Sequence, residues 1–314
     1  MIPENMRDPA HYAQVRLPAE KARPLPNWCY TSEAFFQLEI EHIFMKVWNY
    51  AGHDSQIPDP GDYFCLDVTG VPVIIIRGAD NEVRAFYNAC RHRGSRIASG
   101  EGHCQKLVCP YHRWTYETDG RLTGTPLIEE DSHLQHTDLG LLPVRMERWH
   151  GFLFINFDEN AAPLTDWLGD LPQTCASYSP GDLVCTRRMV WDVNANWKLH
   201  FENFNDSLHI PFVHGGTLAR QKVSARKRTS HEEFNGECIV HFTSHDGSRA
   251  LMHGDSGFPN IESLEGRYQT GTWYPCILPT TMMAWTIDSL FVFELHPKGP
   301  ASMQVVGASF FPKD

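Results

Sequence analysis

The sequence lacks the features of a membrane or secreted protein. No run approaches the ~18 apolar residues that a membrane-spanning helix needs. The longest apolar stretch, Val71–Ile76, is short and β-branched and predicts a buried strand. The N-terminus has no basic segment followed by an apolar core, which a secretory signal would require. We therefore expect a cytoplasmic protein with no membrane partner.

Positive charge is scarce and the cysteines form no regular pattern. Lys and Arg total 27 against 38 Asp and Glu, so the formal net charge of the 314 residues is −11. Phosphate binding requires a basic face, so this balance argues against a nucleic-acid partner. The nine cysteines are scattered and odd in number, which argues against a disulfide framework.

Composition and predicted secondary structure divide the chain into three regions. Residues 1–48 contain a proline-rich arm and a helix predicted over residues 33–48, which we expect to pack on the C-terminal domain. Residues 49–157 alternate short strands with turn signals and predict a small all-β domain. Residues 158–314 combine strands with a few helices, which predicts an α+β domain.

Two short motifs in the predicted all-β domain each combine a cysteine with a histidine. Cys90 and His92 form Cys-x-His, and Cys109 and His112 form Cys-x-x-His, with sixteen residues between the motifs. A Rieske [2Fe–2S] cluster uses this ligand set, with two Cys on one iron and two His on the other. Zinc is the alternative, but structural zinc motifs usually pair Cys with Cys and His with His. The spacing therefore favours a cluster that relays electrons.

A second group of candidate ligands lies in residues 202–214. A helix is predicted from Trp197 to His209, and Pro211 would end or kink it, so that His209 and His214 point into one cavity. Two histidines and a carboxylate bind Fe(II) in non-heme oxygenases. An isolated pair of this kind is more often two satisfied histidines at a helix end. Beside an electron relay, an iron that accepts electrons is the preferred interpretation.

Asp206 precedes His209 by three residues, roughly one helical turn. Its carboxylate can hydrogen-bond a metal-ligating imidazole, and it can also bridge to a cluster histidine. The alternative is a solvated acid on a helix surface.

Together these motifs resemble the large (α) subunit of Rieske non-heme iron oxygenases of the aromatic ring-hydroxylating type. The resemblance covers nearly the whole chain and rests on the two Cys/His pairs, the hairpin at Gly120–Gly124 and the segment from Glu202 to His214. It implies an α+β fold, in which an all-β Rieske domain is inserted in a helix-grip (START-like) catalytic domain with an antiparallel sheet. The step from Asn203 to His209 is most similar to the terephthalate, salicylate and demethylase branches.

The resemblance also implies roles for single residues. His209 and His214 would ligate the mononuclear Fe(II), Asp206 would bridge this iron and a Rieske cluster, and Asn203 would lie near the iron without ligating it.

The family's third iron ligand is a carboxylate in a later helix. Asp288 and Glu294 are the only acids in the corresponding region, and both lie in predicted strands. We therefore expect the third ligand beyond Asp314, in a part of the protein that this sequence does not include.

Partners and cofactors follow from the same resemblance. O2 would react at the Fe(II), with electrons from NAD(P)H delivered through a reductase and sometimes a ferredoxin. Family members assemble as head-to-tail homotrimers or as α3β3 complexes with a small subunit. The preferred reaction is mono- or dihydroxylation of a small aromatic compound, with an aromatic carboxylate favoured by the branch resemblance.

Three alternatives stay open. A Rieske monooxygenase or demethylase of a quaternary ammonium compound, a methylated amine or an ether would keep both iron sites, and an aromatic cage would favour it. A pure Rieske electron carrier would need only residues 49–157, so the second motif argues against it. A regulatory or inactive homologue would be indicated if the third ligand were absent.

The sequence defines the substrate pocket only weakly. The basic run from Arg220 to Arg228 can bind a carboxylate, or it can be a solvated loop or subunit contact. Candidate wall residues, each equally compatible with the core, are Phe204, Leu208, Phe212, Trp273, Met282, Met283, Trp285 and Phe291.

Overall fold

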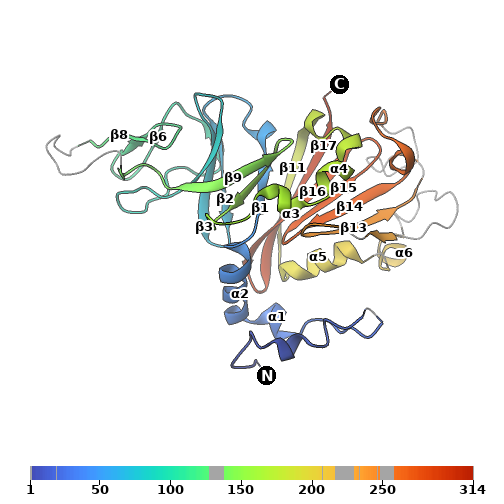
Figure 1. Ribbon diagram of the computed structural model, residues 1–314. Helices are drawn as coiled ribbons and strands as arrows, with labels where there is room; N and C mark the ends of the chain where they lie inside the picture. The colour runs from blue at the N-terminus through green and yellow to red at the C-terminus, as the bar shows by residue number, and fades with distance from the viewer. Residues whose placement is uncertain are drawn as a thin grey trace.

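Two seven-stranded antiparallel sheets lie side by side in the computed structural model, and the N-terminal segment lies below them (Figure 1). The predicted α+β fold class, with an all-β domain beside a larger mixed domain, is confirmed. No helix among the described residues is both long and apolar enough to cross a membrane. The structure describes residues 2–18, 20–126, 138–206, 208–215, 230–232, 234–245, 247 and 258–313.

The first sheet has the strand order β1-β10-β9-β4-β3-β2-β5. Beyond it, a three-stranded sheet of β6, β7 and β8 projects away from the rest of the molecule (Figure 1). The strands of these two sheets are β1 (Asn49–His53), β2 (Asp62–Val68), β3 (Val71–Arg77), β4 (Val83–Tyr87), β5 (Glu101–His103), β6 (Leu107–Val108), β7 (Thr115–Tyr116), β8 (Leu122–Gly124), β9 (Pro143–Trp149) and β10 (Phe152–Asn156).

The second large sheet has the order β11-β17-β16-β15-β14-β13-β12. Helices α5 and α6 run along its lower side in the view of Figure 1. Its strands are β11 (Leu183–Val193), β12 (Ser230–Glu232), β13 (Cys238–Thr243), β14 (Thr272–Ile277), β15 (Thr281–Trp285), β16 (Leu290–Gly299) and β17 (Ser302–Pro312). The associated helices are α3 (Leu164–Leu168), α4 (Leu171–Thr174), α5 (Trp197–Asn205) and α6 (Ile210–Val213).

The N-terminal segment forms two short helices, α1 (Trp28–Thr31) and α2 (Glu33–Glu39), and α2 continues as a π-helical turn over Ile40–Phe44. The helix predicted over residues 33–48 is therefore too long. The Asn49 side chain donates to the carbonyl oxygens of Phe44 (2.8 Å) and Val47 (3.0 Å). These bonds satisfy carbonyls that a continuing helix would use, and β1 begins at Asn49. Short 3₁₀ turns occupy Pro9–Tyr12, Asp54–Gln56, Ala176–Tyr178, Pro180–Asp182 and Gly266–Gln269.

One hydrophobic core joins the two large sheets. Phe152 of β10 packs against Trp285 of β15 and Phe310 of β17, with ring centroids 6.3 and 5.6 Å away. All three side chains are fully buried. Burial of such large rings contributes roughly 2 to 3 kcal/mol each, so the two sheets are held as one packed unit.

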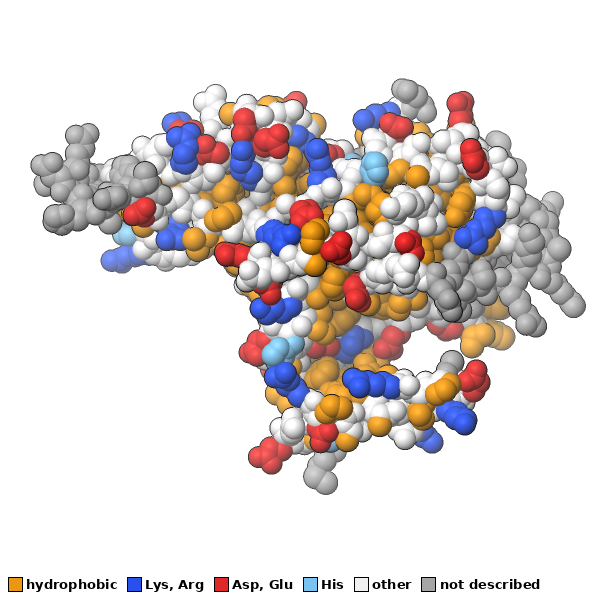
Figure 2. Space-filling model, viewed as in Figure 1, with side chains coloured by type: hydrophobic (Ala, Val, Ile, Leu, Met, Phe, Trp, Pro, Cys, Tyr) orange, Lys and Arg blue, Asp and Glu red, His pale blue; other side chains and the backbone are white. Residues whose placement is uncertain are grey.

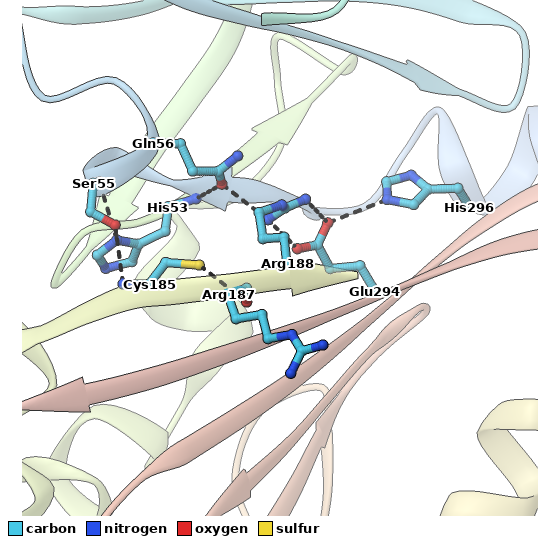
Figure 3. Close-up of polar contacts among 8 residues, drawn as sticks. All are labelled: His53, Ser55, Gln56, Cys185, Arg187, Arg188, Glu294 and His296. Carbon is cyan, nitrogen blue, oxygen red and sulfur yellow. Dashed lines mark hydrogen bonds and ion pairs between the residues drawn. The ribbon is translucent and has the colours of Figure 1, made fainter. Parts of the chain in front are cut away.

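A buried polar network crosses the same boundary (Figure 3). Arg188 of β11 donates to the Glu294 carboxylate of β16 at 2.9 Å and to Gln56 Oε1 at 3.0 Å. His296 Nε2 lies 3.3 Å from the same carboxylate. Burial alone would raise the pKa of Glu294, but Arg188 and His296 together hold it below its usual value. Glu294 is therefore a charged structural group at the domain boundary.

Candidate functional site

Two loops of the first domain carry the Cys/His motifs and are built alike. The Gly94 N–H donates to the Cys90 carbonyl at 2.8 Å, and the Arg113 N–H donates to the Cys109 carbonyl at 3.0 Å. The fourth residue after each cysteine has left-handed backbone, with φ of 71° at Gly94 and 60° at Arg113. Glycine adopts this conformation freely, whereas Arg113 adopts it at a cost of about 1 kcal/mol.

The loops bring all four predicted cluster ligands together. Cys90 and Cys109 are buried, at 3% and 1% exposure, whereas His92 and His112 are exposed. The imidazole centroids lie 4.7 Å apart. Burial raises the pKa of the Cys90 thiol, and its interaction with Cys109 raises it further. The ligand set therefore consists of a buried thiol pair and an exposed imidazole pair.

Aromatic rings hold the two imidazoles in place. Trp114, which is buried, stacks on His92 with centroids 4.9 Å apart and planes within 8°. Tyr111 stacks on His112 at 3.8 Å. Each imidazole therefore has an aromatic partner that restricts its orientation.

Tyr116 contributes a hydrogen bond that the sequence motifs do not reveal. Its hydroxyl lies 3.3 Å from Cys90 Sγ and accepts a hydrogen bond from the Arg91 N–H at 3.1 Å. Since the backbone N–H occupies a lone pair of the hydroxyl, the phenolic proton is free to donate to the sulfur. The side chain is fully buried, and burial together with Cys90 raises the pKa of Tyr116.

This arrangement fits a two-iron cluster better than a zinc ion. In the described part of the chain, no three His, Cys, Asp or Glu side chains are placed to hold one metal ion. Structural zinc gathers four ligands around a single ion, whereas a Rieske cluster places two ligands on each of two irons. A set divided into a thiol pair and an imidazole pair matches the second case.

The helix predicted over residues 197–209 is interrupted. Helix α5 ends at Asn205, and Asp206 has extended backbone, with φ −93° and ψ 116°. The Asp206 carboxylate accepts a hydrogen bond from the Leu208 N–H at 2.7 Å. Pro211 lies in the first turn of α6, where its missing N–H is not needed. The prediction that Pro211 ends or kinks the helix is therefore wrong, because Asp206 ends it earlier.

The interruption brings His209 and His214 together. Their ring centroids are 5.2 Å apart and their planes meet at 66°. His209 Nδ1 is buried, and its nearest carboxylate oxygen, on Asp206, lies 3.4 Å away, beyond ordinary hydrogen-bond length. Two imidazoles side by side, one with a carboxylate behind it, form a donor set suited to Fe(II).

A cavity of about 300 Å³ opens beside these histidines. Helix α5 supplies three of the residues that line it, His200, Asn203 and Phe204, whose spacing places them on one face of the helix. The full lining consists of these three residues with Asp206, His209, Ile210, His214, His241, Thr243, Tyr274 and Phe293. All four predicted residues of the second motif therefore face one cavity.

Aromatic rings form part of the cavity wall. Phe204 meets Tyr274 and Phe293 edge to face, with centroids 5.8 and 6.0 Å away. His241 stacks on Tyr274 at 4.6 Å, within 9° of parallel. Burial lowers the pKa of His200 below its usual value, so this histidine is neutral at pH 7. Among the described residues that line the cavity, none is Lys or Arg.

Most of the wall residues proposed from the sequence lie elsewhere. Phe204 lines the cavity, as predicted. Trp273, Met282, Met283 and Trp285 are fully buried in the core, which was the alternative reading of those residues. Leu208 and Phe212 are 80% and 87% exposed, and Phe291 does not line the cavity. The basic run from Arg220 to Arg228 lies outside the described residues.

The two downstream acids do not reach the histidine pair. Asp288 is fully buried and accepts hydrogen bonds from the hydroxyls of Thr286 and Ser289, each at 2.9 Å. Glu294 belongs to the boundary network with Arg188. Neither carboxylate lines the cavity, so the position of the third ligand beyond Asp314 stays a prediction.

Several residues that line the cavity lie outside the sequence motifs and were not predicted to belong to the site. His200 carried a usable signal, because it shares a helical face with Asn203 and Phe204. His241, Tyr274 and Phe293 come from three different strands, and only the register of the sheet brings them together.

Comparison with known proteins agrees with this division of the chain. Residues 47–139 match the family model for the Rieske [2Fe-2S] domain, and residues 180–314 match that for the ring hydroxylating alpha subunit (catalytic domain). The carnitine monooxygenase oxygenase subunit of Acinetobacter baumannii is 36% identical over 214 residues, covering 67% of this chain and 57% of the relative. The Escherichia coli subunit is 30% identical over 281 residues, covering 85% and 75%.

Solved structures are similar over a larger share of the chain. The quaternary ammonium Rieske monooxygenase CntA in complex with L-carnitine has a TM-score of 0.79 at 27% identity, covering 93% of this chain and 76% of that one. Naphthalene 1,2-dioxygenase with indole bound has a TM-score of 0.78 at 26% identity, covering 92% and 72%. The chain therefore spans only part of its relatives, and backbone similarity alone does not separate the two substrate classes.

Proposed function

The chain belongs to the family of large subunits that join a Rieske [2Fe–2S] domain to a ring-hydroxylating α-subunit catalytic domain, and we propose that it is the oxygenase of a quaternary ammonium monooxygenase. The aromatic wall of the cavity carries this proposal. The names of the curated relatives support it, since they are monooxygenases of carnitine. The match to a catalytic domain over residues 180–314 counts against a pure electron carrier.

The residues present fit the two metal groups that the family implies. Cys90, His92, Cys109 and His112 would hold the cluster, and His209 and His214 would supply two of the iron ligands. When bound, the cluster supplies single electrons and the non-heme iron supplies O2 activation. The protein's own contribution is to bring these ligands together, and the Asp206 carboxylate, 3.4 Å from His209 Nδ1, would raise the basicity of that ring through its charge.

The cavity wall is suited to a methylated ammonium group. Phe204, Tyr274 and Phe293 present three ring surfaces or edges around one space. A quaternary ammonium ion has no N–H to donate, so aromatic faces are its natural partners, and each contact contributes about 0.5 to 2 kcal/mol. Neutral His200 adds no repulsion toward such a cation.

The same cavity is less suited to an aromatic carboxylate, the substrate preferred from motif spacing. A carboxylate in a desolvated site needs Arg, Lys or several N–H donors. The described lining offers neither Arg nor Lys, and it already contains the Asp206 carboxylate, so it suits the ammonium group of a quaternary ammonium compound, whereas any carboxylate, including that of carnitine or glycine betaine, would have to lie outside this lining. We therefore place the quaternary ammonium alternative ahead of the terephthalate- and salicylate-type reading.

The positions of the two sites support electron transfer between subunits. The three-stranded sheet, whose β6–β7 connection carries Cys109 and His112, lies at one end of the molecule, and α6 lies toward the other (Figure 1). We propose a head-to-tail ring of subunits. In it, the exposed His92 and His112 of one subunit approach the residues His209 and His214 of the next. Asp206, whose side chain is 44% exposed, is placed to meet that neighbour. A reductase, with or without a ferredoxin, would supply the electrons.

The test compares charged and neutral substrates of the same shape. Holoenzyme, reductase and NAD(P)H are incubated with choline, glycine betaine and carnitine, with 3,3-dimethylbutanol as the neutral analogue of choline, and with benzoate and salicylate. O2 uptake and product are measured together. We expect coupled turnover with at least one quaternary ammonium compound and much weaker binding of the neutral analogue. Coupled hydroxylation of benzoate or salicylate alone would refute the proposal.

A further inference from the structure

Helix α5 lines the cavity with one face and contacts the N-terminal helices with another. One face carries His200, Asn203 and Phe204 into the cavity. Lys198 and Glu202, four residues apart on another face, contact the N-terminal helices instead. Helix α5, which lines the cavity, is thus bound on another face by α1 and α2, which precede the domain with the cluster ligands in the sequence. In the space-filling view the N-terminal segment lies below the main body of the molecule (Figure 2).

The first contact is a buried ion pair between α2 and α5. Lys198 Nζ donates to Glu39 Oε1 at 2.6 Å, and the side chains are 10% and 4% exposed. Trp197 Nε1 donates to the second carboxylate oxygen at 3.3 Å. The Lys198 ammonium also lies 5.4 and 5.6 Å from the ring centroids of Tyr30 and Phe35. Both oxygens of the Glu39 carboxylate therefore have a donor on α5, and the Lys198 ammonium lies between this carboxylate and two aromatic rings.

The second contact lies one helical turn further along α5. The Tyr30 hydroxyl donates to Glu202 Oε1 at 2.6 Å. Burial and the Glu202 carboxylate raise the pKa of Tyr30, so the phenol remains a donor at neutral pH. Glu202 directly precedes Asn203, which faces the cavity.

The third contact fixes the start of the helix. Asn196 caps α5, since its side-chain oxygen accepts a hydrogen bond from the Lys198 N–H at 3.1 Å. The Asn196 amide in turn donates to the Tyr30 carbonyl at 3.1 Å and to the Pro300 carbonyl at 2.8 Å. The capping residue is therefore tied to α1 on one side and to the second sheet on the other.

Buried ion pairs of this kind add little stability compared with apolar side chains of the same size. Their directional bonds do permit only one arrangement of the groups they join. A rotation of α5 about its axis would break the bonds at Lys198 and Glu202 together. The same rotation would move His200, Asn203 and Phe204 out of the cavity wall.

We propose that four residues set the rotation of α5 and thereby position His209 and His214. We call these residues the α5 anchor, and they are Tyr30, Glu39, Lys198 and Glu202. These are positioning residues, because they act through the helix and touch neither substrate nor metal. The inference rests on the proposed function only in so far as His209 and His214 hold iron. The N-terminal helices would thus influence the catalytic site through α5 without lining its cavity.

The test removes one hydroxyl from the anchor and one from a matched site. Tyr30→Phe deletes the bond to Glu202, whereas Tyr12→Phe deletes a bond to the Met6 carbonyl within the N-terminal arm. Both variants are prepared as holoenzyme. Iron retention at the mononuclear site is measured against a chelator, and that ferrous site is probed by EPR with nitric oxide bound. The Rieske EPR spectrum serves as an internal control.

We expect Tyr30→Phe to weaken iron retention about 10-fold and to change the nitric oxide EPR spectrum, with the Rieske signal unchanged. Tyr12→Phe should leave all three readouts unchanged. Glu202→Ala should reproduce the effect, and the double variant Tyr30→Phe/Glu202→Ala should be no worse than either single change, since both remove the same bond.

An iron site in Tyr30→Phe that matches the Tyr12→Phe control would overturn the anchor. Additive effects in the double variant would overturn it as well. The proposed substrate class is tested separately, because the iron and EPR measurements need no substrate. If the wild-type enzyme oxidises no quaternary ammonium compound but the anchor variants change the iron spectrum, the anchor stands and the substrate proposal fails.

Discussion

Replacing Tyr116 with Phe should lower the reduction potential of the cluster without displacing it. The phenolic hydroxyl lies 3.3 Å from Cys90 Sγ, and a donor at this sulfur stabilises the reduced, more negative cluster. A hydrogen bond to a charged acceptor contributes about 1.5 kcal/mol. For a one-electron couple, about 1.4 kcal/mol corresponds to about 59 mV. We therefore expect the potential to fall by roughly 60 mV if most of this energy belongs to the reduced state.

A spectroscopic redox titration of the purified holoenzyme measures this shift. Tyr87→Phe is the matched control, because Tyr87 lies in the same domain and packs against Phe157. The ring of Tyr116 is retained in the variant, so the core around the cluster stays filled. The Arg91 N–H loses its acceptor, which costs about 1 kcal/mol of stability. A potential equal to that of the Tyr87→Phe control would refute the assigned direction of the hydrogen bond.

Four further changes have definite expected outcomes. His209→Ala should abolish oxygenation and leave only the two cluster irons in metal analysis, and a third retained iron would contradict the assignment. Arg113→Gly should raise the free energy of unfolding by about 1 kcal/mol in denaturant titration, because Gly accepts φ 60° without strain. Phe204→Leu should raise KM for the quaternary ammonium substrate about 10-fold through loss of a cation–π contact, whereas exposed Phe212→Leu should not. Burial lowers the pKa of His200 from 6.5, so as pH falls below 6.5 the unfolded chain binds this proton first and folding stability decreases. Protonation of folded His200 at still lower pH should raise KM for choline but not for its neutral analogue, and a His200→Gln variant should lose this difference.

Local patterns were sufficient to predict the four residues of the cluster loops and the α+β fold class. Cys90, His92, Cys109 and His112 lie within two tight turns, so their spacing alone indicates how they meet. The strands of the second domain alternate or run apolar in ways that need no tertiary information. For these elements the conformation that the local sequence prefers is also the conformation that the fold needs.

The end of α5 shows where local patterns fail. Proline normally signals a helix end, so the sequence predicts that Pro211 ends or kinks this helix. Asp206 ends the helix instead, because its carboxylate binds the Leu208 N–H and its backbone is extended. An aspartate side chain that binds a nearby backbone N–H competes with the helical hydrogen bonds, and the residue pattern alone does not show which of the two prevails.

The cavity walls depended on information that no short segment contains. Trp273 and Tyr274 are neighbours in β14, yet Trp273 is fully buried in the core and Tyr274 faces the cavity. Alternation along the strand separates them, but only the packing of α5 decides which side becomes a pocket. The anchor pairs join residues more than 150 positions apart, which no motif search would connect.

Those long separations also impose an order of events during synthesis. Glu39 and Lys198 are 159 residues apart, so at 5 to 20 residues per second the lysine leaves the ribosome about 8 to 32 s after the glutamate. The strands of the cluster domain all emerge within that interval and can pair among themselves. Throughout this interval the Glu39 carboxylate of α2 lacks its partner Lys198. The nascent chain therefore passes through a state in which α2 has been synthesised and its partner helix α5 has not.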